Sequence, residues 1–183
     1  MDIFLKNRSI LIIILASCLF CGCGYTARSV LPDNMRSIYV ENFINKITVT
    51  KEVSDSRIYY PYKPGMEVDI TRRVIDRFIF DGNYQIKSDK EAYFILKGQL
   101  VSYRREPLRY DADDTVLEYR LSVVVDIELY NREDGNLVWR ENNFAGESTY
   151  RTTGEVRQTE STALRAATED LARRLVERTV ENW

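Results

Sequence analysis

The residues able to carry out chemistry are restricted in both type and position in this chain. No histidine occurs among the 183 residues, and the three cysteines, Cys18, Cys21 and Cys23, all lie near the N-terminus. A Ser-His-Asp triad, a Cys-His pair and a His-liganded zinc or haem site are therefore excluded from the folded part of the chain. Carboxylates, lysine, arginine, tyrosine and hydroxyl groups remain. We expect no catalytic residues, no metal site and no cofactor.

One acidic cluster has the residue types of a cation site or of an acid–base pair. Asp111, Asp113 and Asp114 stand within four residues of one another, and carboxylate oxygens bind divalent cations and transfer protons. The cluster lacks the glycine and the distal glutamate of an EF-hand loop. We interpret it as a solvated acidic loop, and a carboxylate- or metal-dependent hydrolase is the alternative.

The charge balance excludes one class of partner. The chain has 26 Lys and Arg against 28 Asp and Glu, so no excess positive charge is present for a phosphate backbone. We expect no nucleic-acid partner. Tyrosine occurs 12 times, and its amphipathic ring suits half-wet surfaces and interfaces.

The N-terminus is organised like an export signal. Lys6 and Arg8 precede a charge-free run over residues 10–20, which is shorter than the ~20 residues of a membrane-spanning helix. The cysteines that follow resemble the lipobox of bacterial lipoproteins, in which one cysteine is acylated. Cys18 has the better lipobox before it, whereas Cys23 leaves a fuller apolar run. A plain signal peptide with incidental cysteines is the remaining alternative.

Two amphipathic helices are predicted in the rest of the chain. In the first, apolar residues recur at steps of three and four, and Asp81-Gly82-Asn83 ends the pattern. The second begins at an N-cap, Thr159, and runs to Trp183. The apolar stripes are Met66, Ile70, Val74, Ile75, Phe78 and Ile79 in the first helix and Leu164, Ala167, Leu171 and Leu175 in the second.

The remaining periodicity is that of strands. Odd positions from Leu117 to Leu129 are apolar and most even positions are polar, which indicates a strand with one buried face. Strands are predicted over residues 37–43, 93–104, 117–129 and 137–145, with a short edge piece over 84–87 and loops over 46–63 and 146–158. This order predicts an α+β two-layer sandwich, with two helices packed on one face of a mostly antiparallel or mixed four-stranded sheet.

Several of these residues resemble a known family. Gly22-Cys23-Gly24-Tyr25, followed by Leu31-Pro32 and the strand from Ser37 to Val40, is similar to the mature start of the lipopolysaccharide-assembly lipoproteins, the LptE family. The strand near Glu118, the hairpin return and the Arg-rich last helix extend the resemblance over nearly the whole mature chain. It implies a lipoprotein signal peptide over residues 1–22 and a single periplasmic α+β domain over residues 23–183, anchored through Cys23 with Cys18 as runner-up.

The resemblance also implies a function. Members of this family are non-catalytic lipoproteins on the periplasmic side of the outer membrane, where they plug an LptD-type β-barrel and bind lipopolysaccharide. Basic loop residues are implicated in that binding. The matching positions here are Arg109 and Arg157, with Arg104, Arg105 and Arg151 nearby. Each of these arginines can instead be a solvated surface charge. A lipoprotein that serves another envelope machine or binds peptidoglycan is the alternative function.

Overall fold

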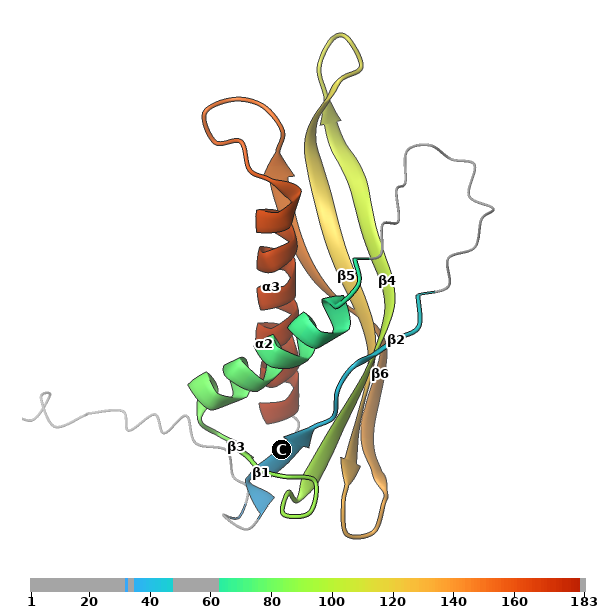
Figure 1. Cartoon of the computed structure of the whole chain (residues 1–183), viewed down its shortest axis with the longest axis vertical. Helices are drawn as coiled ribbons and strands as arrows, with labels where there is room; N and C mark the ends of the chain where they lie inside the picture. The colour runs from blue at the N-terminus through green and yellow to red at the C-terminus, as the bar shows by residue number, and fades with distance from the viewer. Residues whose placement is uncertain (1–31, 33–34, 48–62, 182–183) are drawn as a thin grey trace, which may run out of the picture.

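The computed structural model describes residue 32 and residues 35–47 and 63–181. The predicted signal peptide and both candidate lipidation residues, Cys18 and Cys23, lie outside these residues, as does most of the predicted loop over residues 46–63. The described part contains two helices and a sheet of six strands. Its elements, labelled as in Figure 1, are β1 (Ser37–Val40), β2 (Ile44–Asn45), α2 (Met66–Asp81), β3 (Gln85–Ile86), β4 (Phe94–Tyr110), β5 (Val116–Asn131), β6 (Leu137–Arg151) and α3 (Glu160–Val180).

The predicted α+β class is confirmed, whereas the predicted count of four strands is wrong. The strand order is β3-β1-β4-β5-β6, and β2 pairs with β4 outside this path. The short edge piece predicted over residues 84–87 is present as β3, and β2 is a further strand that the sequence does not predict; each has two residues. A strand as short as β2 carries no periodicity that a sequence pattern could reveal. The sheet is mixed, since β1 is parallel to both β3 and β4, whereas β5 is antiparallel to its neighbours β4 and β6.

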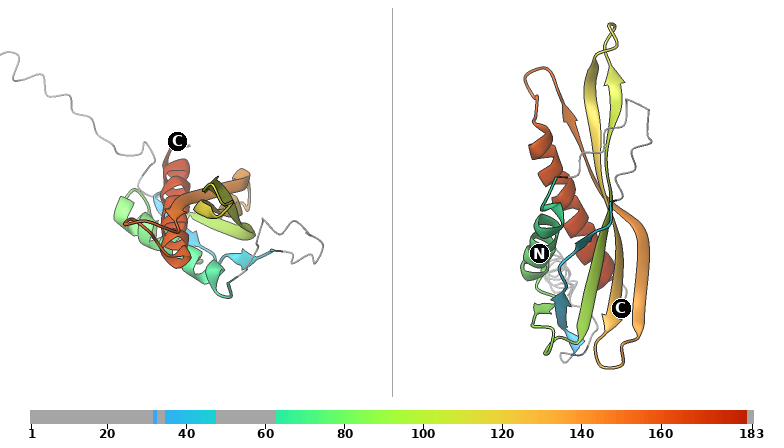
Figure 2. Two further views of the ribbon diagram at one scale, coloured as in Figure 1. Left: turned by 90° about the horizontal axis from the view of Figure 1, so that it is seen from above. Right: turned by 45° about the vertical axis from the view of Figure 1, so that its right-hand side comes forward.

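Three long strands set the shape of the molecule. β4, β5 and β6 have 17, 16 and 15 residues, and they form the tall twisted ribbon that runs the length of the molecule in Figure 1. Both helices lie on the same side of this ribbon, as Figure 2 shows, and leave the opposite face without a helix. We call these the helix-covered face and the helix-free face.

The helix-covered face holds the hydrophobic core. Leu121, Val123, Val125 and Ile127 of β5 have no exposed surface, and they lie in one cluster with the buried stripes of both helices. The predicted burial of the odd positions is therefore confirmed, whereas the predicted wet face is wrong at Ser122 and Val124, which are even positions and only 3% and 2% exposed. Burying each such side chain contributes roughly 1.5–3 kcal/mol to the free energy of folding.

The helices begin close to where the sequence predicts. The side chain of Thr159 caps α3 by accepting a hydrogen bond from the Thr162 backbone N–H at 3.2 Å. Gly82 ends α2 with φ of +76°, a conformation that glycine adopts without strain. α3 ends at Val180, three residues before the predicted end at Trp183.

Two strands extend further than predicted, and this moves the candidate site from loops into the sheet. β4 continues through Pro107 to Tyr110, and β6 continues through Gly146 to Arg151. Within the described residues β4 has no strand partner on its outer side beyond Leu100, and an edge of this kind is where a strand tolerates proline. Gly146 lies directly under α3, where a Cβ atom would be 2.4 Å from the Ala167 carbonyl oxygen. The small and polar residues of this segment therefore follow from close helix packing.

Candidate functional site

The predicted ligand-binding arginines gather at one end of the sheet. By register, Arg109 of β4 is opposite Glu118 of β5, and Glu118 is opposite Arg151 of β6. Arg157 forms an isolated β-bridge with Arg151. Because neighbouring strands are about 4.8 Å apart, Arg109 and Arg151 are roughly 10 Å apart along this row. We call Arg109, Arg151 and Arg157 the arginine row. Of the two predicted loop positions, Arg157 does lie in a loop, whereas Arg109 is a strand residue.

The arginine row has free guanidinium groups. All three side chains are exposed, and within the described residues none of them forms an ion pair. Glu118 is the single carboxylate between them by register. A guanidinium presents several N–H donors in a planar fork that matches carboxylate and phosphate oxygens. The row can therefore bind an anionic group without first breaking an internal ion pair.

The other two predicted arginines are divided between the two faces of the sheet. Arg104 is opposite Ser122 on the helix-free face, and its guanidinium is 3.8 Å from the Glu106 carboxylate. Arg105 is opposite the buried Leu121 and so points to the helix-covered face. The structure thus brings Arg109, Arg151 and Arg157 together and separates Arg104 and Arg105 from them.

Arg105 belongs to an ionic cluster below the start of α3. Its Nη1 donates to Glu160 Oε2 at 2.7 Å, the Tyr103 hydroxyl donates to Glu160 Oε1 at 3.0 Å, and Lys63 Nζ is 3.3 Å from the same oxygen. We call these four residues the Glu160 cluster. The Arg105 guanidinium also lies 4.8 Å from the Tyr119 ring centroid. This cluster fixes β4 to the first turn of α3.

The electrostatics of the cluster favour a charged Glu160. Burial works against ionisation, but hydrogen bonds from Tyr103 and Lys63, together with the positive charges of Lys63 and Arg105, hold the pKa of Glu160 below its ordinary value. Burial and the neighbouring Glu160 charge raise the pKa of Tyr103, so that its hydroxyl stays a donor. Sequence reasoning missed this cluster, because Glu160 is 55 residues or more from Arg105 and Tyr103 and no local pattern joins them.

The acidic residues 111–114 form the turn of the β4–β5 hairpin, beyond the arginine row. The Asp111 carboxylate accepts hydrogen bonds from the backbone N–H groups of Asp113 and Thr115 at 2.9 and 2.8 Å. Asp114 adopts a positive φ of 59°, which aspartate tolerates in turns. Asp111 therefore has a structural role in the turn, and over the described residues no group of three Cys, Asp or Glu side chains is arranged to hold a metal ion.

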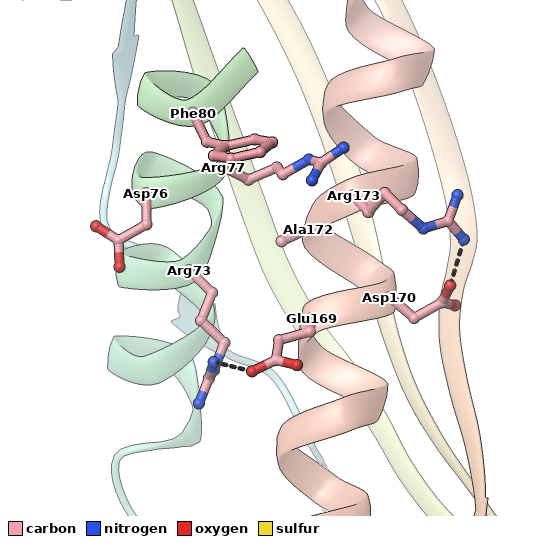
Figure 3. Close-up of a pocket in the computed structure, with 8 residues that line it drawn as sticks. All are labelled: Arg73, Asp76, Arg77, Phe80, Glu169, Asp170, Ala172 and Arg173. Carbon is pink, nitrogen blue, oxygen red and sulfur yellow. Dashed lines mark hydrogen bonds and ion pairs between the residues drawn. The ribbon is translucent and has the colours of Figure 1, made fainter.

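A groove between the two helices differs from the arginine row in its charge. It encloses about 620 Å³, and Figure 3 shows its lining side chains projecting from α2 and α3. It contains three arginines and three carboxylates, and two pairs are formed: Arg73 with Glu169 at 2.9 Å and Arg173 with Asp170 at 2.5 Å. The groove is therefore electrically balanced and has no excess charge for an anionic ligand. Among the described residues no helix has the length and apolar character needed to cross a membrane.

The geometry defines a class of protein: an α+β domain whose core occupies one face of a long sheet and which carries, at one end, three exposed arginines that form no ion pair within the described residues. Residues 35–179 match the model of the LptE family, described as lipopolysaccharide-assembly. The match spans most of the chain, and the protein belongs to this family. The resemblance noted from the sequence is thereby confirmed. A comparison with curated proteins finds no match.

Solved structures similar to this chain include bacterial proteins of low sequence identity. A minor lipoprotein from Acinetobacter baumannii is 18% identical, with a TM-score of 0.53 over 81% of this chain and 94% of that one. The protein CT253 from Chlamydia trachomatis is 9% identical, with a TM-score of 0.51 over 80% and 96%. The rare lipoprotein B from Shewanella oneidensis is 16% identical, with a TM-score of 0.47 over 78% and 94%. At these identities the first two similarities establish the fold alone.

Proposed function

We propose that this protein is a non-catalytic outer-membrane lipoprotein that binds lipopolysaccharide through its arginine row and assists its assembly at the cell surface as the plug of an LptD-type β-barrel. The observation that carries the proposal is the row itself: three exposed arginines, adjacent across two strands and a loop, without an ion-pair partner in the described chain. The phosphates and acidic sugars of lipopolysaccharide are the anions that this arrangement suits.

The helix-free face supports the role of a plug. Its charged side chains pair across strands, with Arg140 2.6 Å from Glu128 and Arg120 4.0 Å from Glu147. A barrel lumen is polar and hydrated, and a face of this kind can form hydrogen bonds with such a wall without burying unpaired charge. Membership of the lipopolysaccharide-assembly family supports the same partner.

Lipopolysaccharide binding is tested by reversing the charge of two arginines in the row. We expect Arg109→Glu with Arg157→Glu to weaken binding by about 1.5–3 kcal/mol for each charged hydrogen bond lost. Arg72→Glu with Arg165→Glu is the matched control, because these arginines are also exposed but lie on the two helices. The measurement is binding of the purified protein to lipopolysaccharide at two salt concentrations. Equal binding by wild type and the Arg109/Arg157 variant would exclude the row as the binding site.

The barrel partner is tested separately, by co-purification from outer membranes extracted with detergent. We expect a large β-barrel to co-purify with wild type and with the charge-reversed variant, since an interface of standard size draws on many side chains. Loss of the barrel with lipopolysaccharide binding intact would instead place the arginine row in the protein interface. Sedimentation with peptidoglycan and no barrel would favour the alternative, a lipoprotein of another envelope machine.

The anchor is proposed to be acylated Cys23 at the outer membrane. Several acyl chains hold a lipoprotein firmly, since each buried methylene adds about 0.8 kcal/mol. Gly24 follows Cys23, where an aspartate is the usual signal for retention in the inner membrane. Intact-mass analysis should show a lipid adduct on wild type and on Cys18→Ala, and none on Cys23→Ala. An adduct that persists in Cys23→Ala would move the anchor to Cys18.

A further inference from the structure

We infer that Glu160 is a positioning residue, which ties the start of α3 to β4 and thereby holds Arg157 at a fixed place relative to Arg109. The inference rests on the proposed function only for what the arginine row binds. The positional part stands on the contacts of the Glu160 cluster alone.

The chain connects Glu160 to both arginines over short distances. Arg157 is three residues before Glu160, and Arg109 is four residues after Arg105 on the same strand. The pair between Arg105 and Glu160 therefore joins the loop that carries Arg157 to the strand that carries Arg109. The capping bond from Thr162 to Thr159 keeps this first turn of α3 rigid.

The loop is held at a second point, on β6. The backbone N–H of Gln158 donates to the Arg151 carbonyl at 2.9 Å, and that of Arg157 donates to the Gly154 carbonyl at 3.3 Å. Gly154 has φ of +87°, which glycine permits at the turn of the loop. One attachment fixes the loop to Arg151, and the Glu160 cluster fixes it to β4. Together the two attachments fix the positions of all three arginines of the row relative to one another.

Within this cluster the Glu160 carboxylate accepts both of the hydrogen bonds that come from β4. Tyr103 and Arg105 both donate to Glu160, and Tyr103 is 1% exposed, so its hydroxyl has little access to water. Removing the charge of Glu160 weakens both tethers at once. The same charge is unfavourable for a bound anion, so its presence three residues from Arg157 is explained by positioning and not by ligand binding.

Electrostatics and positioning predict opposite changes in lipopolysaccharide affinity for a variant that lacks the Glu160 charge. Glu160→Gln removes a negative charge near the anion site, so electrostatics alone would tighten lipopolysaccharide binding. Loss of positioning would weaken it. Glu155→Gln is the matched control, because Glu155 is an exposed glutamate of the same loop whose side chain has no hydrogen-bond or ion-pair partner among the described residues.

The experiment measures position and affinity on the mature acylated lipoprotein in detergent. Spin labels at Leu108→Cys and Val156→Cys, both exposed neighbours of the two arginines, report the distance between β4 and the loop. We expect Glu160→Gln to broaden the distance distribution and to weaken lipopolysaccharide binding roughly three- to tenfold, because the arginines are retained and binding must only order the loop that carries Arg157. We expect Glu155→Gln to leave the distribution unchanged and binding no weaker.

An unchanged distance distribution in Glu160→Gln, or binding that becomes tighter, would overturn the inference. If Glu160→Gln does not fold, Tyr103→Phe removes a single tie and should broaden the distribution to a smaller extent. Wild type that shows no lipopolysaccharide binding would overturn the proposed function, while the distance measurement would still decide whether Glu160 positions the loop.

Discussion

The two faces of the long sheet differ in the number of charged side chains they carry and in the partners of those side chains. On the helix-covered face β5 presents Leu121, Val123, Val125 and Ile127 without exposed surface, and the one charged group described on this face of β4, Arg105, is paired with Glu160. On the helix-free face charged side chains are frequent and pair across neighbouring strands. One set of strands therefore contributes the hydrophobic core through one face and a charged surface through the other.

The helix-free face itself changes along its length. Arg104, Arg120 and Arg140 have carboxylate partners at 2.6 to 4.0 Å. Beyond them, at the hairpin end, Arg109 and Arg151 have none within the described residues. Arginine content alone does not distinguish these regions. The ion pairs that are formed do distinguish them, since Arg109 and Arg151 have no ion pair within the described residues although Glu118 lies between them by register.

The largest effect is expected from placing a charge on the helix-covered face. Val125→Asp would bury an unpaired carboxylate at a site with no exposed surface, at a cost of several kcal/mol. This is comparable with the total stability of a typical domain, roughly 5–15 kcal/mol, so we expect the variant to be unfolded in a thermal melt. Glu128→Lys on the opposite face should retain the fold. The reverse order of damage would contradict the assignment of the two faces.

A smaller loss is expected from filling the contact between α3 and β6. A methyl group in Gly146→Ala would meet the Ala167 carbonyl oxygen and the Leu171 Cβ, both at 2.4 Å, and backbone must move to admit it. Overpacking of this kind costs about 1–3 kcal/mol. Thr149→Ala, on the exposed side of the same strand, is the control for denaturant unfolding. Equal midpoints for the two variants would show that α3 does not press on β6 at this residue.

The Glu160 cluster makes stability depend on pH in acid. The pKa of Glu160 is lower in the folded protein than its ordinary value of 4.5, because hydrogen bonds and the charges of Lys63 and Arg105 outweigh burial. Its contribution is therefore present above pH 4.5 and is lost as the pH falls through the folded-state pKa. Melting temperatures from pH 6 to pH 3 should decline less steeply for Glu160→Gln than for wild type. Parallel curves would show that this carboxylate contributes no acid sensitivity.

The smallest effect is expected from an arginine that is already paired. Arg104 and Glu106 are 3.8 Å apart and both substantially exposed, and such pairs contribute about 0–1 kcal/mol. Arg104→Ala should therefore unfold near the wild-type midpoint and bind lipopolysaccharide more tightly than Arg109→Ala does. Equal loss of binding in the two variants would remove the distinction between paired and unpaired arginines.

The elements with a strong period could be predicted from the sequence, and those without one could not. The apolar stripe of α2 and the alternation of β5 are sufficient to predict these two elements, because each pattern reflects the burial of one face. The end of β6 has no such periodic pattern, and the sequence therefore does not predict it as a strand. Gly146 and Ser148 face α3 but are too small and polar to look buried, and α3 is what requires small residues there. β4 extends beyond its predicted end at Arg104 through Arg105, Glu106 and Pro107, which do not continue the apolar alternation that predicts a strand.

The candidate site was predictable by residue type and not by geometry. Arg109 and Arg157 were identified through the resemblance, and the sheet register then brought Arg151 between them. Glu160 could not be identified, since its partners Tyr103 and Arg105 are distant in sequence. Contacts of this kind exist only once β4 and α3 have packed together.

Because β4 is long, a small rotation at one end of the strand produces a large displacement at its other end. β1, the first strand of the described chain, pairs with β4 beginning at Phe94, and Arg109 is 15 residues further along. At about 3.3 Å per residue these two points are roughly 50 Å apart. A rotation of about 5° at the Phe94 end would therefore carry Arg109 through roughly 4 Å, further than the length of a hydrogen bond. A small change in the angle at which the Phe94 end is held is therefore amplified into a displacement of Arg109 at the far end of the strand.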